Sequence, residues 1–177
     1  MYSSRRFKSW ERSCAMLITQ AELFWGLNHD FVEHVMADAS KETKSEGDVL
    51  FLKGEKADYF YTLIKGRVKL SIGENGRMVF VVSRAGESFG WSSLVDRNEY
   101  SASAECADTT TVVKIKREKL EAICSKFPND GYIFMKRVAG MLGRRLLTSY
   151  GMSLSLQQAA EATSHGTDQI VELVTPE

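Results

Sequence analysis

The spacing of hydrophobic residues changes twice along the chain. Near the N-terminus it is helical, and Asn28 is expected to be the N-cap of a helix. The apolar residues of that helix recur at i, i+1, i+4 and i+5: Phe31, Val32, Val35 and Met36. From about Lys41 onward, short apolar and alternating runs replace the helical spacing, and it returns at Arg117. This order predicts a mainly β domain with flanking helices.

The central region divides into short strands that end at glycine-containing turns. Its clearest strand runs from Val68 to Ile72, where apolar and polar residues alternate. The pair Asn75-Gly76 that follows is a strong hairpin signal. Further runs cover residues 49–52, 59–64, 78–82, 101–107 and 109–116. The series indicates about eight strands and predicts a double-stranded β-helix, which is a jelly-roll-like β-roll.

Two helices are expected after the roll. In the first, Leu120, Ile123 and Phe127 share one face, and a Pro-Asn-Asp sequence separates it from the second. The second helix has an apolar stripe that consists of Phe134, Val138, Met141, Leu142 and Leu146. The expected organisation is a mobile arm over residues 1–12, one domain over residues 13–150 and a weakly ordered tail over residues 151–177.

Composition and charge argue against several classes of protein. Lys and Arg (23) balance Asp and Glu (23), and residues 153–177 contain no Lys or Arg, so direct DNA binding is not expected. No apolar run reaches the roughly 18 residues of a membrane-spanning helix, so no membrane contact is expected. The three widely spaced cysteines fit a reducing, cytoplasmic location better than a disulfide framework.

An enzyme is not expected either. The three histidines, His29, His34 and His165, lie outside the strand region. They are therefore badly placed for the metal site of a cupin, an enzyme class that is built on a jelly-roll. The sequence contains no Ser/His/Asp or Cys/His arrangement with a plausible placement. The prediction is that the chain has no catalytic residue and no metal site.

The stretch Ala85–Leu94 carries the most informative chemistry. The stretch comes after a strand and contains a glycine turn and then one short helical turn, which begins at Gly90. A glycine in this place allows several backbone N–H groups to converge, and such groups bind anions, phosphate above all. The stretch predicts a phosphate cradle within the β domain.

Several stretches between Ala21 and about Tyr150 resemble, in order, the cyclic nucleotide-binding domain of the catabolite activator and protein kinase A regulatory type. The similar stretches are residues 22–27, 46–50, 53–58, 61–68 and 85–90, and the last is similar to the start of the family's phosphate-binding cassette. The resemblance implies a β-roll that binds a cyclic nucleotide (cAMP or cGMP) or another small anion. It implies no other cofactor. It also implies a homodimer through residues 131–150, where the apolar stripe resembles the family's dimerising helix.

The cassette departs from the family pattern at two positions. Trp91 stands where the family has a glutamate that binds the ribose 2′-OH, and Tyr100 stands where it has an arginine that pairs with the cyclic phosphate. The loss of such an arginine removes roughly 2–5 kcal/mol of binding free energy. The candidate ligand-binding residues are Phe89, Gly90, Trp91, Ser92, Ser93, Arg97, Tyr100, Ser101 and Ala102.

Two functions remain open from the sequence. The first is a regulatory sensor domain that binds a nucleotide or small anion in this non-standard cassette and signals through its C-terminal helices. The alternative is an interaction or dimerisation module that has lost cyclic nucleotide binding, or a fragment of a transcription regulator. The two missing family residues favour the alternative, whereas the remaining cradle favours the sensor.

Overall fold

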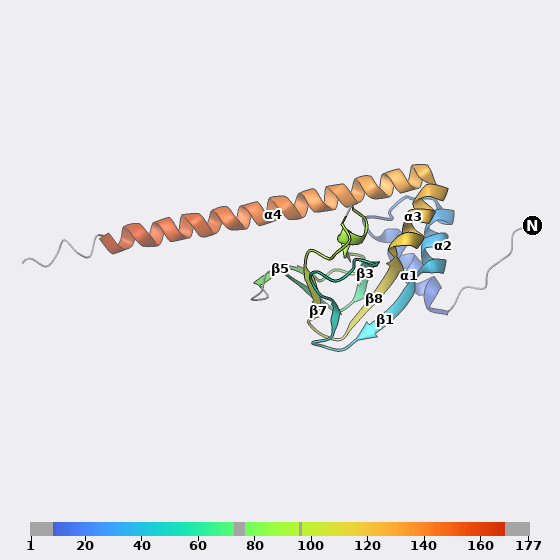
Figure 1. Cartoon of the computed structure of the whole chain (residues 1–177), viewed down its shortest axis with the longest axis horizontal. Helices are drawn as coiled ribbons and strands as arrows, with labels where there is room; N and C mark the ends of the chain where they lie inside the picture. The colour runs from blue at the N-terminus through green and yellow to red at the C-terminus, as the bar shows by residue number, and fades with distance from the viewer. Residues whose placement is uncertain (1–8, 73–76, 96, 169–177) are drawn as a thin grey trace, which may run out of the picture. The chain divides into compact units, whose positions relative to one another are not determined.

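The computed structural model describes residues 9–72, 77–95 and 97–168 (Figure 1). Four helices and a short 3-10 turn accompany eight strands in this part of the chain. The helices are α1 (Ser9–Gln20), α2 (His29–Asp38), α3 (Arg117–Lys126) and α4 (Pro128–Asp168), and the 3-10 turn is η1 (Trp91–Ser93). The strands are β1 (Ser40–Lys44), β2 (Val49–Phe51), β3 (Tyr59–Lys65), β4 (Val68–Ile72), β5 (Arg77–Val82), β6 (Ser88–Phe89), β7 (Ser103–Cys106) and β8 (Thr110–Lys116).

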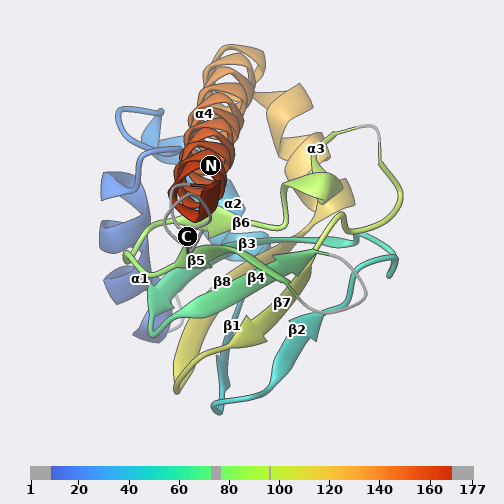
Figure 2. The same cartoon turned by 90° about the vertical axis from the view of Figure 1, so that its left-hand side faces the viewer.

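The strands form two antiparallel sheets, with the orders β1-β8-β3-β6 and β2-β7-β4-β5 (Figure 2). Their pairing is nested: β4 pairs with β5, β3 with β6, β2 with β7 and β1 with β8. Nested pairing of this kind is the pattern of a chain that is folded back on itself and rolled up. The predicted β-roll with helices on both sides of it in the sequence is therefore confirmed.

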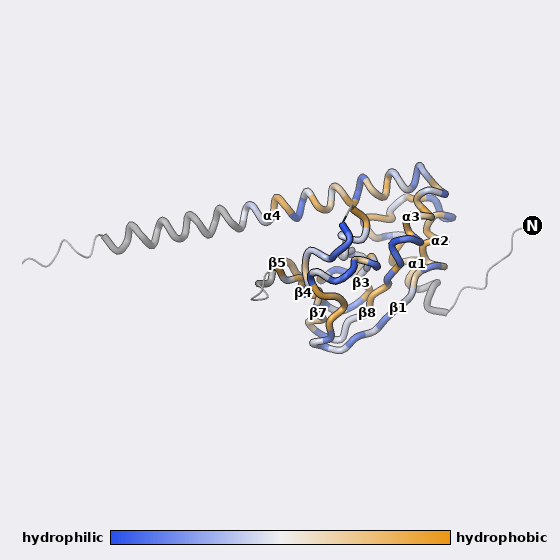
Figure 3. Tube along the Cα trace, in the orientation of Figure 1, coloured by the Kyte–Doolittle hydropathy of each residue, from blue (hydrophilic) through white to orange (hydrophobic). Residues whose placement is uncertain are grey.

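Two strands of the sheets are not among the runs that the sequence indicates. The strand β1 has the polar sequence Ser-Lys-Glu-Thr-Lys and is coloured blue to white in Figure 3. It forms an edge of its sheet and pairs with β8, which supplies the buried residues of the pair. The strand β6 has only two residues, so it is too short to show a period.

Both faces of β3 are buried, which places it between the roll interior and the helices. Tyr61 and Leu63 belong to the apolar cluster inside the roll. Phe60 packs on the other face against Phe134 of α4, with ring centroids 5.9 Å apart. Helices α1, α2 and α3 lie beside the sheet that contains β3 and β8 (Figure 1).

The start of α2 agrees with the sequence prediction, whereas α1 starts earlier than expected. Asn28 caps α2, as predicted, because its side-chain oxygen accepts a hydrogen bond from the backbone N–H of Asp30 at 3.0 Å. Helix α1 begins at Ser9, earlier than the predicted arm boundary. The rest of the arm, residues 1–8, and the Asn75-Gly76 turn lie outside the described residues.

Helix α4 runs to Asp168 and passes through Gly151, although the sequence suggests a boundary and a weakly ordered tail there. A glycine within a helix costs only about 1 kcal/mol relative to alanine, and the following Leu, Gln, Ala and Glu residues favour helix. The chain divides into two compact units, residues 1–138 and 139–177. Within the described residues, no helix combines the length and apolar character that a membrane crossing requires.

Candidate functional site

The cassette begins where β6 joins the centre of β3. Phe89 pairs with Tyr61 and Ser88 with Thr62, and the hydroxyls of Ser88 and Thr62 lie 3.0 Å apart. Gly90 follows with a φ of +75°. A Cβ atom at this position would lie 3.0 Å from a ring carbon of Tyr61. The positive φ and the close approach to β3 together explain why a glycine is needed.

The serines of the cassette are bound to other groups of the cassette. The Ser93 hydroxyl donates to the Gly90 carbonyl at 2.9 Å. The Ser92 hydroxyl accepts from the backbone N–H of Ser101 at 3.2 Å and lies 3.3 Å from the Ser101 hydroxyl. Ser92 and Ser93 are buried, so both hydroxyls fix the path of the loop and do not point into solvent.

Tyr100 lies inside the roll with only 4% of its surface exposed. Its hydroxyl donates to the backbone carbonyl of Tyr59 at 2.8 Å and accepts from the backbone N–H of Tyr59 at 3.0 Å. Its ring is stacked on that of Phe51, with centroids 3.8 Å apart and an interplanar angle of 17°. Tyr100 therefore joins β2 and β3 through both its ring and its hydroxyl.

A second aromatic stack extends this packing. Tyr61 and Phe89 have ring centroids 5.2 Å apart and an interplanar angle of 13°. Burial raises the pKa of the Tyr61 phenol and of the Tyr100 phenol above its usual value, because the charged phenolate would lose its hydration. The inward side of the cassette is thus filled by apolar side chains of the chain itself, with both phenols neutral.

The other predicted site residues are spread around this packed region. Trp91 is half-buried and begins η1, and Ala102 is half-buried just before β7. Arg97 is exposed, and its backbone carbonyl accepts a hydrogen bond from a guanidinium nitrogen (Nη1) of Arg117 at 3.1 Å. The structure therefore brings together Phe89, Gly90 and Tyr100 around β3, and Ser92 with Ser101. Within the described residues, no hydrogen bond or ion pair joins the Arg97 side chain to them.

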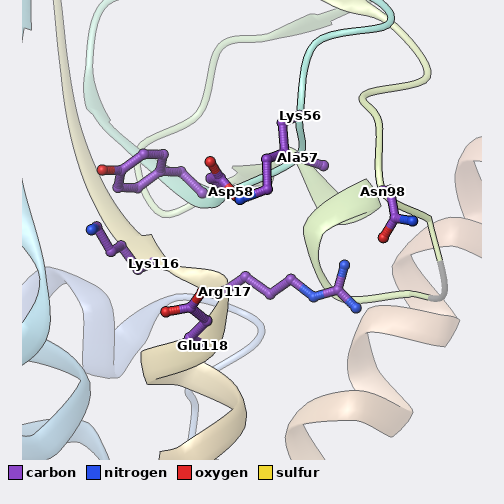
Figure 4. A pocket seen from close by; sticks show the side chains of 8 residues that line it. Lys56, Ala57, Asp58, Asn98, Lys116, Arg117 and Glu118 are labelled. Atoms are coloured by element: carbon purple, nitrogen blue, oxygen red, sulfur yellow. The ribbon is translucent and has the colours of Figure 1, made fainter.

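A cavity of about 310 Å³ lies outside the roll, against the same loop. We call it the outer pocket, and its lining residues are Lys56, Ala57, Asp58, Tyr59, Asn98, Lys116, Arg117 and Glu118. Figure 4 shows Lys56, Ala57 and Asp58 on one side, the junction of β8 and α3 opposite, and the Arg117 side chain extending toward Asn98. The outer pocket thus lies where the cassette loop, the start of β3 and the start of α3 meet.

Hydrogen bonds between its three walls fix the outer pocket. The backbone N–H of Ala57 donates to the Asn98 carbonyl, and that of Arg117 donates to the Asp58 carbonyl, both at 2.8 Å. The Lys56 ammonium lies 2.8 Å from an Asp58 carboxylate oxygen, and this carboxylate raises the pKa of Lys56. The Arg117 guanidinium pairs with Glu121 at 2.8 Å.

The sequence gives little sign of these features. The aromatic residues of β3 are visible as a run, but nothing local shows that Tyr100 bonds to a backbone 41 positions away. The residues of the outer pocket come from three separate segments, so no single motif identifies them. Within the described part of the chain, no group of three or more His, Cys, Asp or Glu side chains is placed to hold a metal ion.

Comparison with known proteins gives one family. The family described as "Cyclic nucleotide-binding domain" matches residues 41–127. The chain is 26% identical over 155 residues to the cyclic AMP receptor protein of Thermus thermophilus, which covers 86% of this chain and 69% of that protein. It is 28% identical over 138 residues to Lysophospholipase NTE1 of Cryptococcus neoformans, and this match covers 77% of this chain but only 8% of the lysophospholipase.

Solved structures share the fold. The crystal structure of a cyclic nucleotide-binding domain from Methylobacillus flagellatus superposes with a TM-score of 0.69. It is 21% identical in sequence, and the match covers 82% of this chain and 83% of that domain. At this level of identity the similarity concerns the fold alone.

Proposed function

Because residues 41–127 of the chain belong to the cyclic nucleotide-binding domain family, we propose that it is a regulatory module whose roll is closed by its own aromatic side chains. It acts through contacts of its helices and does not bind a cyclic nucleotide in the manner of the family. The observation that carries this proposal is the position of Tyr100. Its side chain occupies the interior at the position where the resemblance implies the phosphate-pairing arginine, and both its ring and its hydroxyl are engaged.

The energetic argument follows from what a ligand would have to displace. To vacate the interior, Tyr100 must give up its stack on Phe51 and leave the N–H and C=O groups of Tyr59 without their partner. An unsatisfied buried polar group costs about 1–3 kcal/mol. Even the lower bound for two such groups, about 2 kcal/mol, weakens an apparent affinity by about 30-fold.

The output of the module is assigned to the C-terminal helices and to a homodimer formed through residues 131–150. On α4, Leu146, Leu147 and Tyr150 are 52%, 69% and 57% exposed. Apolar side chains that recur on one side of a long helix are typical of a surface that pairs with another helix. In this proposal the role of the chain is regulatory.

A second candidate function is the sensor. Its support is the 26% identity to a protein named cyclic AMP receptor protein over 86% of the chain. In this case a nucleotide or small anion is held at Gly90, Trp91, Ser92, Ser93 and Ser101, and Tyr100 moves aside when it binds. The two candidates differ in one respect, which is whether the roll interior accepts a ligand.

Calorimetric titration with cAMP, cGMP and cyclic dinucleotides tests this difference. The expected result for the native chain is no heat and no thermal shift. A double variant, Trp91→Glu with Tyr100→Arg, replaces both residues by those of the family pattern and serves as the comparison that should gain binding. Micromolar binding by the native chain would overturn the closed-roll proposal and support the sensor.

Sedimentation velocity tests the dimer. One chain has a mass of 19.9 kDa, and sedimentation of the native protein at micromolar concentration should give twice this mass. The variant Leu146→Glu with Leu147→Glu should sediment as a monomer because it places charges on the pairing surface. Thr148→Glu, on the other side of the same helix, is the matched control and should remain a dimer. A native monomer would contradict this part of the proposal.

A further inference from the structure

The outer pocket has a charge and an arrangement of donors that the closed-roll proposal does not use. Three cationic side chains, from Lys56, Lys116 and Arg117, and two carboxylates, from Asp58 and Glu118, line it. Its lining therefore carries a net charge of +1, although the whole chain has a net charge of zero. We propose that the outer pocket binds a small organic phosphomonoester, with a size close to that of a sugar phosphate.

The donors that remain available decide the ligand class. Lys56 is paired with Asp58, and Arg117 is held by Glu121 and by the carbonyl of Arg97. The side chains of Lys116 and Asn98 have no hydrogen-bond or ion-pair partner in the described ranges. Figure 4 shows the Arg117 guanidinium extending toward the Asn98 amide, whereas Lys116 lies farther along the same wall as Arg117. An ammonium, a guanidinium and an amide around one pocket suit a dianion that also carries hydroxyl groups.

Size and rigidity support the same class. The volume of about 310 Å³ lies at the lower end of the range for small-molecule sites, about 300–1,000 Å³, and exceeds what an inorganic anion fills. The walls are joined by backbone hydrogen bonds from Ala57 to Asn98 and from Arg117 to Asp58. A site whose walls are already connected loses little conformational entropy when a ligand binds.

The position of the outer pocket gives such a ligand a regulatory role. Asn98 belongs to the cassette loop, and Arg117 is the first residue of α3. A phosphate that contacts both Asn98 and Arg117 adds a bond between the loop and the helix. It therefore stabilises the arrangement in which α3 is docked on the roll.

An NMR titration of the full chain tests the proposal. Ribose 5-phosphate is the probe and ribose the neutral control, at constant ionic strength. The expected result is that the probe shifts the amide signals of Ala57, Asp58, Asn98 and Arg117, whereas ribose does not. Shifts of equal size with ribose, no shifts, or shifts located at Gly90 to Ser93 would each overturn the proposal.

Two variants sharpen the result. Lys116→Gln removes the available ammonium and should weaken binding of the probe about tenfold. Lys65→Gln removes the same charge from the last residue of β3, whereas the first residue of β3, Tyr59, lines the outer pocket. This variant should leave binding of the probe unchanged. Equal weakening by both variants would mean a general charge effect and would overturn the proposal. The closed-roll proposal stands or falls separately, on the titrations with cyclic nucleotides.

Discussion

Two positions in the loop between β6 and β7 differ sharply although they are only two residues apart. We call Tyr100 the inner end and Asn98 the outer end of this part of the loop. At the inner end, Tyr100 is buried, stacked on Phe51 and bonded to the backbone of β3. At the outer end, Asn98 is exposed and lines the outer pocket together with three cationic side chains. The ring and the hydroxyl of Tyr100 both contact other residues, whereas the Asn98 side-chain amide has no hydrogen-bond partner in the described residues. One loop thus packs one side chain into the interior of the roll and leaves another exposed only two positions away.

The largest expected effect concerns the inner packing. Phe89→Ala removes a fully buried ring that is stacked on Tyr61, and it should lower the free energy of unfolding by about 3–5 kcal/mol. Urea unfolding followed by circular dichroism measures this loss. Phe89→Leu keeps most of the volume and should lose clearly less. A loss below about 1 kcal/mol for Phe89→Ala would show that the interior collapses easily and is not rigidly closed.

The next effect isolates the hydroxyl of Tyr100. Tyr100→Phe keeps the ring and leaves the N–H and C=O groups of Tyr59 without their partner, so it should cost about 1–3 kcal/mol. Tyr132→Phe is the matched control because Tyr132 is 68% exposed, and it should be neutral. If both variants unfold at the same urea concentration, the hydroxyl contributes nothing and the comparison of the two loop ends fails.

Alkaline pH provides a weaker perturbation of the same region. Burial raises the pKa of Tyr61 and Tyr100 in the folded chain above the value of 10.0 for an unperturbed phenol. Their contribution to stability is therefore complete below pH 10 and is lost as the pH rises toward the folded pKa. Unfolding curves at several pH values should show this fall. For Tyr100→Phe, the free energy of unfolding should fall less steeply with pH, and its slope should be smaller by up to about 1.4 kcal/mol per pH unit. A slope identical to that of the native chain would contradict the assignment.

The smallest effect belongs to the outer end. Asn98→Ala should change the free energy of unfolding by no more than about 0.5 kcal/mol, because its exposed side chain has no hydrogen-bond partner in the part of the chain that the structure describes. Thermal unfolding of this variant beside the native chain measures the change. A loss as large as that of Tyr100→Phe would mean that both ends of the loop are structural.

The sequence is informative about features that are set locally. The Asn28 cap, the strand from Val68 to Ile72 and the turn at Gly90 each depend on residues close together in the chain, and each is present in the structure. The alternation of buried and exposed residues in this strand holds from Val68 to Leu70, whereas Ile72 is 44% exposed. The similar stretches between residues 22 and 90, in their order, also resemble the family whose model matches residues 41–127.

Features that depend on distant partners are not visible in the sequence. The strand β1 is polar because its apolar contacts come from β8, so no alternation identifies it. The aromatic character of Tyr100 is visible, but its bonds to Tyr59 depend on how β3 and the loop meet. The extent of α4 beyond Gly151 is missed for another reason, because a single glycine is given too much weight as a helix end.

Nested strand pairing also orders the folding reaction from the inside outward. The hairpin of β4 and β5 closes over a short stretch of chain, whereas the pairing of Ser40 with Lys114 must wait for nearly the whole roll between them. Pairing of distant segments has a high entropic cost and folds slowly. We therefore expect β1 to join the sheet last during refolding and to leave it first during unfolding, so hydrogen exchange should be fastest there among the strands.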